Sequence, residues 1–205
     1  FKTFGQRVAQ VVYQAGIPEL PSAVEATTIT RDLILKPAEV QPLSPASKVR
    51  VSKIDRINLA VPFMVQAPHA NWGQPYQDGC EEASVAMVQA FYTDQIFSTP
   101  DAADAELKKI FQWENKTFGY NKDTNAAETA EIMSRYYNQP QVLVRYDITA
   151  DDIRAELRAG RPVIVPAYGK ALKNPYFSNG GPVYHMLVIK GFIGDDNFIT
   201  NDPGT

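Results

Sequence analysis

The feature that most limits the fold of this chain is residues 74–84, where a polar loop becomes an apolar-periodic helix at the only cysteine, Cys80. Beyond this junction, apolar residues recur at helical spacing, which predicts a helix with one stripe against a core. The stripe consists of Ala83, Ala86, Met87, Ala90 and Phe91. On this helix Glu82 and Gln89 can face solvent, and Cys80 lies in the first turn after Gly79, which allows close approach of the backbone.

This position suits a nucleophilic cysteine. The thiolate is the reactive form, and the positive end of a helix lowers the pKa of a thiol. A lone cysteine is more often a small buried apolar residue, but the polar, glycine-preceded setting of Cys80 favours the nucleophile. Glu81 and Glu82 suit a helix N-terminus, yet their charge opposes thiolate formation.

A cysteine nucleophile needs a base, and the chain has two histidines, His69 and His185. His185 opens a run of strand-forming residues, 185–192, which would hold an imidazole on a rigid element. His69 lies in a loop-like segment, where a histidine is usually a solvated side chain. We therefore favour His185 as the base.

The third group of such a site accepts the other imidazole N–H and fixes the tautomer. After His185, a turn and a short strand at 198–200 lead to Asn201 and Asp202, and a hairpin would return this segment to the histidine. Neighbouring residues of a strand point to opposite faces, so only one of the two can serve. The same residues also fit a turn with no other role.

Acyl transfer further requires hydrogen-bond donors for the developing oxyanion. The backbone N–H of Cys80 can supply one, and a side-chain amide just upstream can supply the other. Gln74 and Gln77 are both available. We favour Gln74, because a loop of several residues can fold its side chain back over the start of the helix.

Further motifs accompany these residues. They are Val61-Pro62-Phe63, Gln66, Trp72, Asp78-Gly79-Cys80-Glu81, Ala83-Ser84, Ala86-Met87, Gly160-Arg161-Pro162-Val163-Ile164-Val165, His185-Met186, Gly191-Phe192 and Asp202-Pro203. From roughly residue 59 to the end, this pattern resembles the papain-like cysteine peptidases related to the bacteriocin-leader (double-glycine) processing peptidases. The resemblance implies a triad at Cys80, His185 and Asp202, with the oxyanion glutamine at Gln74. Glu81 departs from the leader-processing members, in which a glycine commonly follows the cysteine.

The composition is that of a globular chain of 205 residues, with 44% hydrophobic and 21% charged residues. The net charge of −3 and the mixed signs argue against a nucleic-acid partner. One cysteine and two histidines are too few for a structural zinc site, and one cysteine excludes an internal disulfide. We expect no metal and no cofactor. The apolar runs are too short to span a bilayer.

The order of the elements predicts an α+β domain. Helices are expected at 101–113, 126–137 and 149–160, and strands at 142–146, 162–166, 185–192 and 198–200. The nucleophile helix would then pack against an antiparallel sheet, which is the papain-like arrangement that the resemblance implies. Aromatic residues of the loop at 168–184 could form one wall of the cleft.

We divide the chain into an N-terminal extension, residues 1–58, and a papain-like peptidase domain, residues 59–205. The extension is expected to contain a helix at 4–15, short strands at 23–35 and 49–59, and a proline-rich linker at 36–48. It could support the domain, cover its cleft or act as a linker. The domain stops just after the candidate triad and could be truncated.

The chain starts at Phe1, so an upstream signal or membrane anchor could have been removed. We favour an extracytoplasmic or membrane-associated bacterial protein. The expected function is a cysteine peptidase that acts on a peptide or protein substrate. The alternatives are a transpeptidase or amidase with the same triad, and a catalytically silent peptide-binding module.

Overall fold

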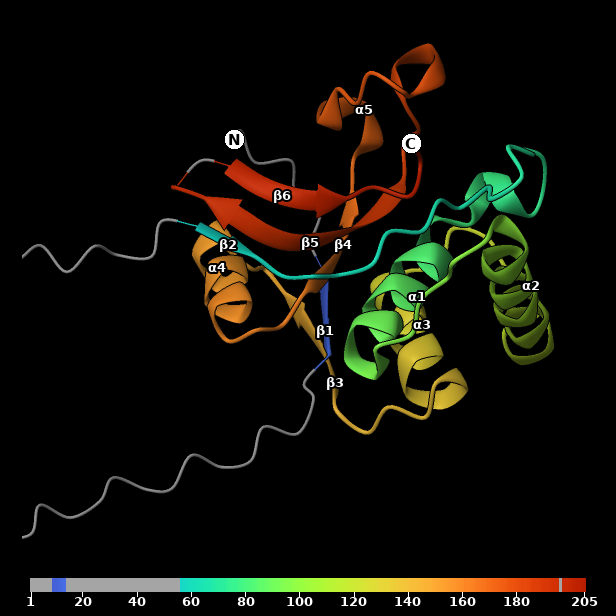
Figure 1. Cartoon of the computed structure of the whole chain (residues 1–205), viewed down its shortest axis with the longest axis horizontal. Helices are drawn as coiled ribbons and strands as arrows, with labels where there is room; N and C mark the ends of the chain where they lie inside the picture. Colours follow the sequence, from blue (N-terminus) through green and yellow to red (C-terminus); the bar gives the residue numbers. More distant parts are fainter. Residues whose placement is uncertain (1–8, 14–55, 196) are drawn as a thin grey trace, which may run out of the picture. The chain divides into compact units, whose positions relative to one another are not determined.

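An antiparallel sheet forms the centre of the fold (Figure 1). The computed structural model describes residues 9–13, 56–195 and 197–205, which belong to one structural unit. The strands of this part are β1 Ala9–Tyr13, β2 Arg56–Asn58, β3 Val142–Tyr146, β4 Val163–Ala167, β5 His185–Ile193 and β6 Asn197–Asn201. They follow the order β2-β5-β4-β1-β3, and β6 pairs with β5. With the helices described below, this sheet makes the domain α+β, as the order of elements predicted.

Strand β5 is paired along both edges. β6 pairs with its residues 188–193, while β4 pairs with residues 185–189 and β2 with residues 191–193. Because a strand has only two edges, β2 continues the edge that β4 begins. The backbone of Leu59 extends this pairing by donating to the carbonyl oxygen of Lys190 at 2.8 Å. β5 is therefore held by three neighbouring strands, and His185 is its first residue.

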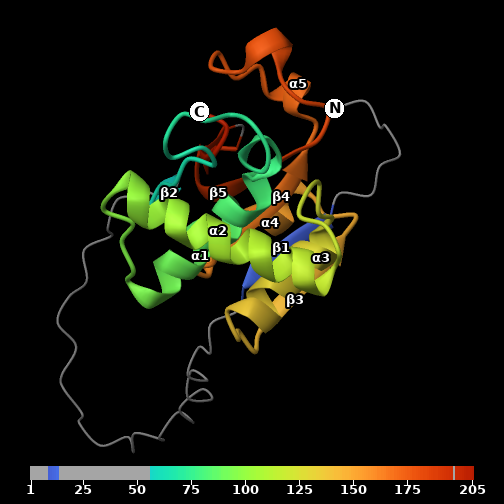
Figure 2. The same cartoon turned by 90° about the vertical axis from the view of Figure 1, so that its right-hand side faces the viewer.

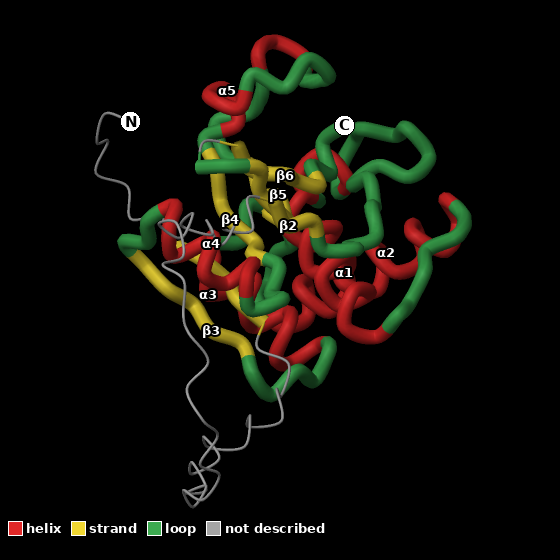
Figure 3. The backbone as a smooth tube through the Cα atoms, turned by 60° about the vertical axis from the view of Figure 1, so that its left-hand side comes forward, coloured by secondary structure: helices red, strands yellow, loops and turns green. Residues whose placement is uncertain are grey.

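Helices cover both faces of the sheet. They are α1 Cys80–Thr93, α2 Pro100–Thr117, α3 Ala126–Glu131, α4 Ala150–Arg158 and the short α5 Gly169–Leu172. Met186 and Val188 pack into one core with α1, α2 and α3, whereas Leu187 and Ile189 pack into a second core with α4. This alternation follows from the two-residue period of a strand. Figure 2 looks onto α2 and α3, and Figure 3 separates the helices from the strands by colour.

The cores explain why the helices lie where they do. α1 is buried along its first eleven residues, from Cys80 to Ala90, because the sheet, α2 and the segment after α3 surround it. Thr99 caps the N-terminus of α2, since its hydroxyl accepts from the Ala102 N–H, and Thr149 caps α4 in a capping box. In the described part of the chain, none of the helices combines the length and the apolar character needed to cross a membrane.

Two expectations from the sequence are wrong. Residues 9–13 form a strand rather than part of a helix, because their backbone pairs with β3 on one side and β4 on the other. Such pairing outweighs a helical pattern in a short segment. Glu82 and Gln89 are buried rather than exposed, because α1 is enclosed on every side.

The predicted helices at 101–113, 126–137 and 149–160 correspond to α2, α3 and α4, and a π-helical turn at Ile132–Tyr136 continues α3. The strands expected at 23–35 and the linker at 36–48 lie outside the described residues. The boundary between residues 58 and 59 stays a prediction, and both β1 and β2 belong to the same sheet as β5.

Gly191 provides a test of the pairing around β5, because a β-bulge lies between Ile189 and Gly191. A Cβ atom at Gly191 would lie 2.1 Å from the Ile57 carbonyl oxygen, which is backbone and cannot move away alone. We expect Gly191→Ala to lower the free energy of unfolding by about 1–3 kcal/mol in urea denaturation, since β2 must be displaced.

Gly73→Ala is the matched control for this prediction. Its Cβ would meet only a side-chain oxygen, that of Asn71 at 3.2 Å, in an exposed loop. Equal stability of the two variants would contradict the close packing of β2 on β5.

Candidate active site

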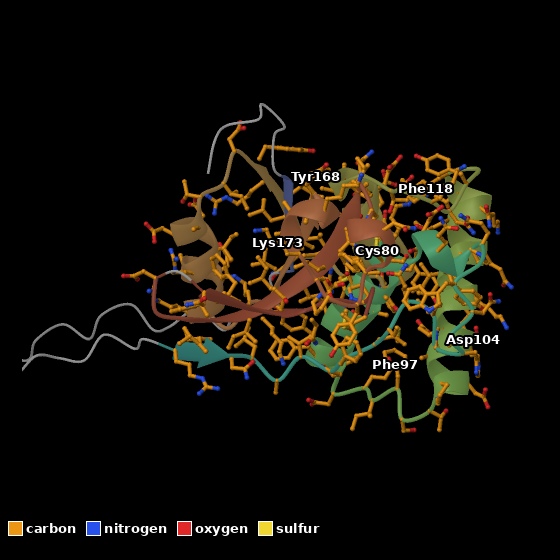
Figure 4. The ribbon with its side chains drawn as sticks, turned by 90° about the horizontal axis from the view of Figure 1, so that it is seen from above. Cys80, Phe97, Asp104, Phe118, Tyr168 and Lys173 are labelled. Atoms are coloured by element: carbon orange, nitrogen blue, oxygen red, sulfur yellow. The ribbon has the colours of Figure 1, made fainter. Side chains whose placement is uncertain are left out.

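Cys80 is the first residue of α1 and lies against the start of β5. A 3-10 turn, Tyr76–Asp78, leads to Gly79, and α1 begins immediately afterwards. Gly79 is packed so closely on Phe111 of α2 that an added Cβ would lie 3.1 Å from the ring. The backbone of Met186 lowers the pKa of the Cys80 thiol, and both residues lie in the same buried core. The cysteine therefore lies beside the residue that follows His185. Figure 4 shows it between the strands and the helices.

His185 and Asp202 form a buried pair at the neighbouring ends of β5 and β6. The distance from His185 Nε2 to Asp202 Oδ1 is 2.7 Å, and the histidine is 3% exposed. Asn174 donates to Asp202 Oδ2 at 2.7 Å, and the Gly204 N–H donates to Oδ1 at 2.9 Å. Burial raises the pKa of Asp202, but His185, Asn174 and the Gly204 N–H together lower it by more, so the net shift is downward. Asp202 is thus an ionised acceptor for the imidazole.

Asn201 turns away from the histidine. Its side-chain amide donates to the carbonyl oxygens of Val61 and Pro62, both at 3.1 Å, and it is 7% exposed. The sequence alone left Asn201 and Asp202 as alternatives. Because successive residues of a strand point to opposite faces, Asp202 contacts the imidazole while Asn201 binds the segment after β2.

The hydrogen bond of the Cys80 thiol is made to Glu81 rather than to His185. Sγ lies 2.9 Å from Glu81 Oε2, and the glutamate is fully buried. Burial raises the pKa of the Cys80 thiol well above its usual value, and the charge and hydrogen bond of Glu81 raise it further. The charges of Glu81 and Glu82 thus oppose ionisation of the thiol, in the direction that the sequence indicated.

Glu81 belongs to a group of three buried carboxyls with Glu82 on α1 and Glu114 on α2. The four carboxyl oxygens of Glu82 and Glu114 meet no protein donor among the described residues, so a hydrogen bond between the two groups requires a shared proton. Burial raises the pKa of Glu81 to about 8 and that of Glu114 to about 7, and it raises that of Glu82 well above its usual value. The cluster therefore holds protons that free carboxyls would lose.

The glutamines at positions 66, 74 and 77, upstream of Cys80, differ in exposure and in hydrogen bonding. The Gln74 side chain is exposed, and its amide donates to Asp78 Oδ2 at 2.7 Å. Gln77 is also exposed. Gln66 is 4% exposed and donates to the carbonyl oxygens of Tyr76 and Gln77, both at 2.9 Å. Gln66 therefore supports the loop that leads to Cys80.

Reasoning from sequence missed one neighbour of the candidate site, Asn174, and placed Phe177 only among the loop aromatics expected to form a wall of the cleft. Asn174 contacts Asp202, and the Phe177 ring packs edge-on against the His185 ring, with centroids 5.1 Å apart. Both lie in the loop before β5, where no periodicity indicates which residues turn inward. His69, by contrast, pairs with Asp101 at 3.1 Å on the surface.

A cavity of about 360 Å³ borders Asp202. Its lining includes the exposed side chains of Phe63, Leu172 and Tyr176 as well as the polar Asn174. Within residues 56–195 and 197–205, no group of three or more His, Cys, Asp or Glu side chains is arranged to hold a metal ion.

Comparison with known protein families finds a match. The sequence profile of the Peptidase_C39 like family matches residues 58–205, which include every candidate site residue. No curated protein and no solved structure matches the chain.

The buried carboxyls predict an unusual pH dependence of stability. A carboxyl whose pKa is raised in the folded state stabilises the fold below its unfolded value of 4.5, and this stability is lost as the pH rises through the folded value, about 7 for Glu114. We expect the free energy of unfolding to fall by on the order of 2 kcal/mol between about pH 5 and pH 8. Urea denaturation at several pH values measures it.

Glu114→Gln should flatten this pH dependence, because an amide does not titrate. Asp202 does not mask the effect: its pKa is lowered, so its contribution is lost only as the pH falls below the range tested. A stability that stays constant or rises between pH 5 and pH 8 would contradict the raised pKa values of the three carboxyls.

Proposed function

The chain belongs to the Peptidase_C39 like family, and from this membership we propose that it is a cysteine peptidase with a papain-like fold that cleaves peptide bonds through Cys80, His185 and Asp202. The observation that carries the proposal is the buried His185–Asp202 pair, 2.7 Å apart, at the end of β5 against which the cysteine lies. An imidazole held by a carboxylate beside a cysteine at a helix start is the arrangement that thiol acyl transfer needs.

The proposed mechanism divides the reaction between these residues. Asp202 binds Nε2 of His185, which leaves Nδ1 to take the thiol proton. The Cys80 thiolate attacks the carbonyl carbon of the scissile bond, and the imidazolium then returns its proton to the leaving amine. Water cleaves the resulting acyl-enzyme; attack by an amine instead would make the same residues a transpeptidase.

The oxyanion of the tetrahedral intermediate needs two donors. We assign one to the Cys80 backbone N–H, because the first N–H groups of a helix have no partner within the helix. The other is assigned to Gln74, six positions before Cys80. Its amide is bound to Asp78 on an exposed loop, so it must turn toward the cysteine when substrate binds.

The cavity beside Asp202 is the proposed place for part of a peptide substrate. Phe63 and Tyr176 are 53% and 76% exposed, and both line it. Exposed aromatic side chains around a hollow suit apolar side chains of an extended peptide. We assign no sequence preference beyond this apolar contact.

A second candidate function is a catalytically silent peptide-binding module. The hydrogen bond from Cys80 to Glu81 and the raised pKa of the thiol favour it. Under that function the cavity would bind peptides, while the thiol would stay protonated. Turnover of a peptide library distinguishes the two functions.

Replacing the nucleophile is the direct test of the peptidase. We expect Cys80→Ala to abolish cleavage of a peptide library, measured by mass spectrometry of the products, because no thiolate remains. Asp202→Asn should lower kcat by about 100-fold, since the imidazolium loses its partner. Circular dichroism verifies the fold of each variant. Full cleavage by Cys80→Ala would rule out this nucleophile.

The oxyanion assignment has its own test, because the chain offers two exposed glutamines. Gln74→Ala should lower kcat by about 100-fold with little change in KM, since the donor acts on the transition state. Gln77→Ala is the matched control and should keep kcat. The reverse result would transfer the role to Gln77 and leave the triad intact.

A further inference from the structure

The contact between the nucleophile and the next residue is not explained by the triad. Glu81 Oε2 lies 2.9 Å from Cys80 Sγ, and the glutamate side chain is fully enclosed. Its second oxygen, Oε1, has no hydrogen-bond partner among the described residues. A buried carboxyl with one oxygen on a reacting atom and the other unsatisfied is costly unless the group is neutral.

We propose that Glu81 is a catalytic residue of the proposed peptidase, which in its protonated form donates a hydrogen bond to the Cys80 thiolate and in its ionised form holds the thiol proton and keeps the nucleophile inactive. The inference rests on the proposed function. It adds a fourth group to the three assigned there, and it makes the charge of Glu81 the switch between an active and a latent cysteine.

The protonated form follows from the surroundings of the carboxyl. The ionisable groups that interact electrostatically with Glu81 come from several segments: Cys80 and Glu82 of α1, Glu114 of α2, Asp123 of the following loop, and Tyr184 before β5. Burial raises the pKa of Glu81 to about 8: it outweighs the hydrogen bond from Cys80, which lowers this pKa, and the carboxyls of Asp123 and Glu114 act in the same direction as burial. At neutral pH, Glu81 therefore carries its proton and can act as a donor.

The proton balance is simple in each form. With Glu81 neutral, the Cys80 S–H bond breaks, the proton moves to His185, and the Glu81 O–H group donates to the sulfur anion that remains. The O–H bond of Glu81 stays intact. With Glu81 ionised, the thiol donates to the carboxylate, and loss of that proton would place two negative charges side by side in a buried site, which is unfavourable.

The test uses the fact that Cys80 is the only cysteine, so alkylation by iodoacetamide reports on this thiol alone and requires no peptidase activity. Glu81→Gln keeps the size of the side chain and a hydrogen-bond donor but cannot ionise. We expect this variant to be alkylated about tenfold faster than the wild type at about pH 9, where wild-type Glu81 is ionised.

Glu114→Gln is the control, because it removes a buried carboxyl of the same cluster without touching the sulfur. It should change the alkylation rate less than Glu81→Gln does. Slower alkylation of Glu81→Gln would indicate that Glu81 acts as a base for the thiol, and it would overturn the inference. An unchanged rate would also overturn it, because Glu81 would then have only a structural role.

The wild-type chain provides a measurement that does not depend on the folding of any variant. Its alkylation rate should rise less steeply above about pH 8 than that of the same chain unfolded in urea, because ionised Glu81 then retains the thiol proton. Coincident pH profiles of the folded and unfolded chains would overturn the inference.

Peptide cleavage separates this inference from the proposed function. If both hold, wild-type cleavage declines above about pH 8, and Glu81→Gln loses that decline. Fast alkylation of Glu81→Gln without cleavage by any form would refute the peptidase while keeping the control of the thiol by Glu81. Cleavage that declines equally in both proteins would refute the role of Glu81 alone.

Discussion

The pairing of β5 with β6 determines the geometry of the candidate site. His185 begins β5, and the chain returns through β6 to Asp202, so their contact depends on the register of this hairpin. A shift by one residue would exchange Asp202 with Asn201, because successive residues of a strand point to opposite faces. The bulge next to Gly191 and the pairing of β2 on the opposite edge hold that register.

Cys80, the proposed nucleophile, is positioned by a helix and not by the hairpin. α1 is enclosed by the sheet and by α2, and its first turn is pressed against Met186, the neighbour of His185. A helix start fixed in this way cannot move away from the strand without opening the main core. The loop before it is less constrained, since buried Gln66 holds Tyr76 and Gln77 while Gln74 remains exposed. The loop that carries Gln74, the proposed oxyanion donor, is thus the less constrained side of the candidate site.

Sequence reasoning predicted elements whose signals are local. The helix at Cys80 and the strand at His185 follow from apolar periodicity, and only two histidines had to be compared. The prediction for residues 9–13 was wrong, because pairing with the distant strands β3 and β4 determines their structure. The prediction for Glu82 was wrong, because packing of α2 and the sheet around α1 buries it. Asn174 could not be found either, because it lies in the aperiodic loop before β5, 28 positions before Asp202 in the sequence.

The acidic start of α1 joins the stability of the fold to the chemistry of the cysteine. Charged side chains favour a helix N-terminus when water surrounds them, but Glu81 and Glu82 are 0% and 1% exposed. Apolar residues of similar size would pack there at lower cost. A fold that keeps three carboxyls in its core must keep them largely protonated, and the proton nearest the sulfur then becomes available to it. The feature that is expected to weaken the core as the pH rises is therefore the same one that we propose controls the Cys80 thiol.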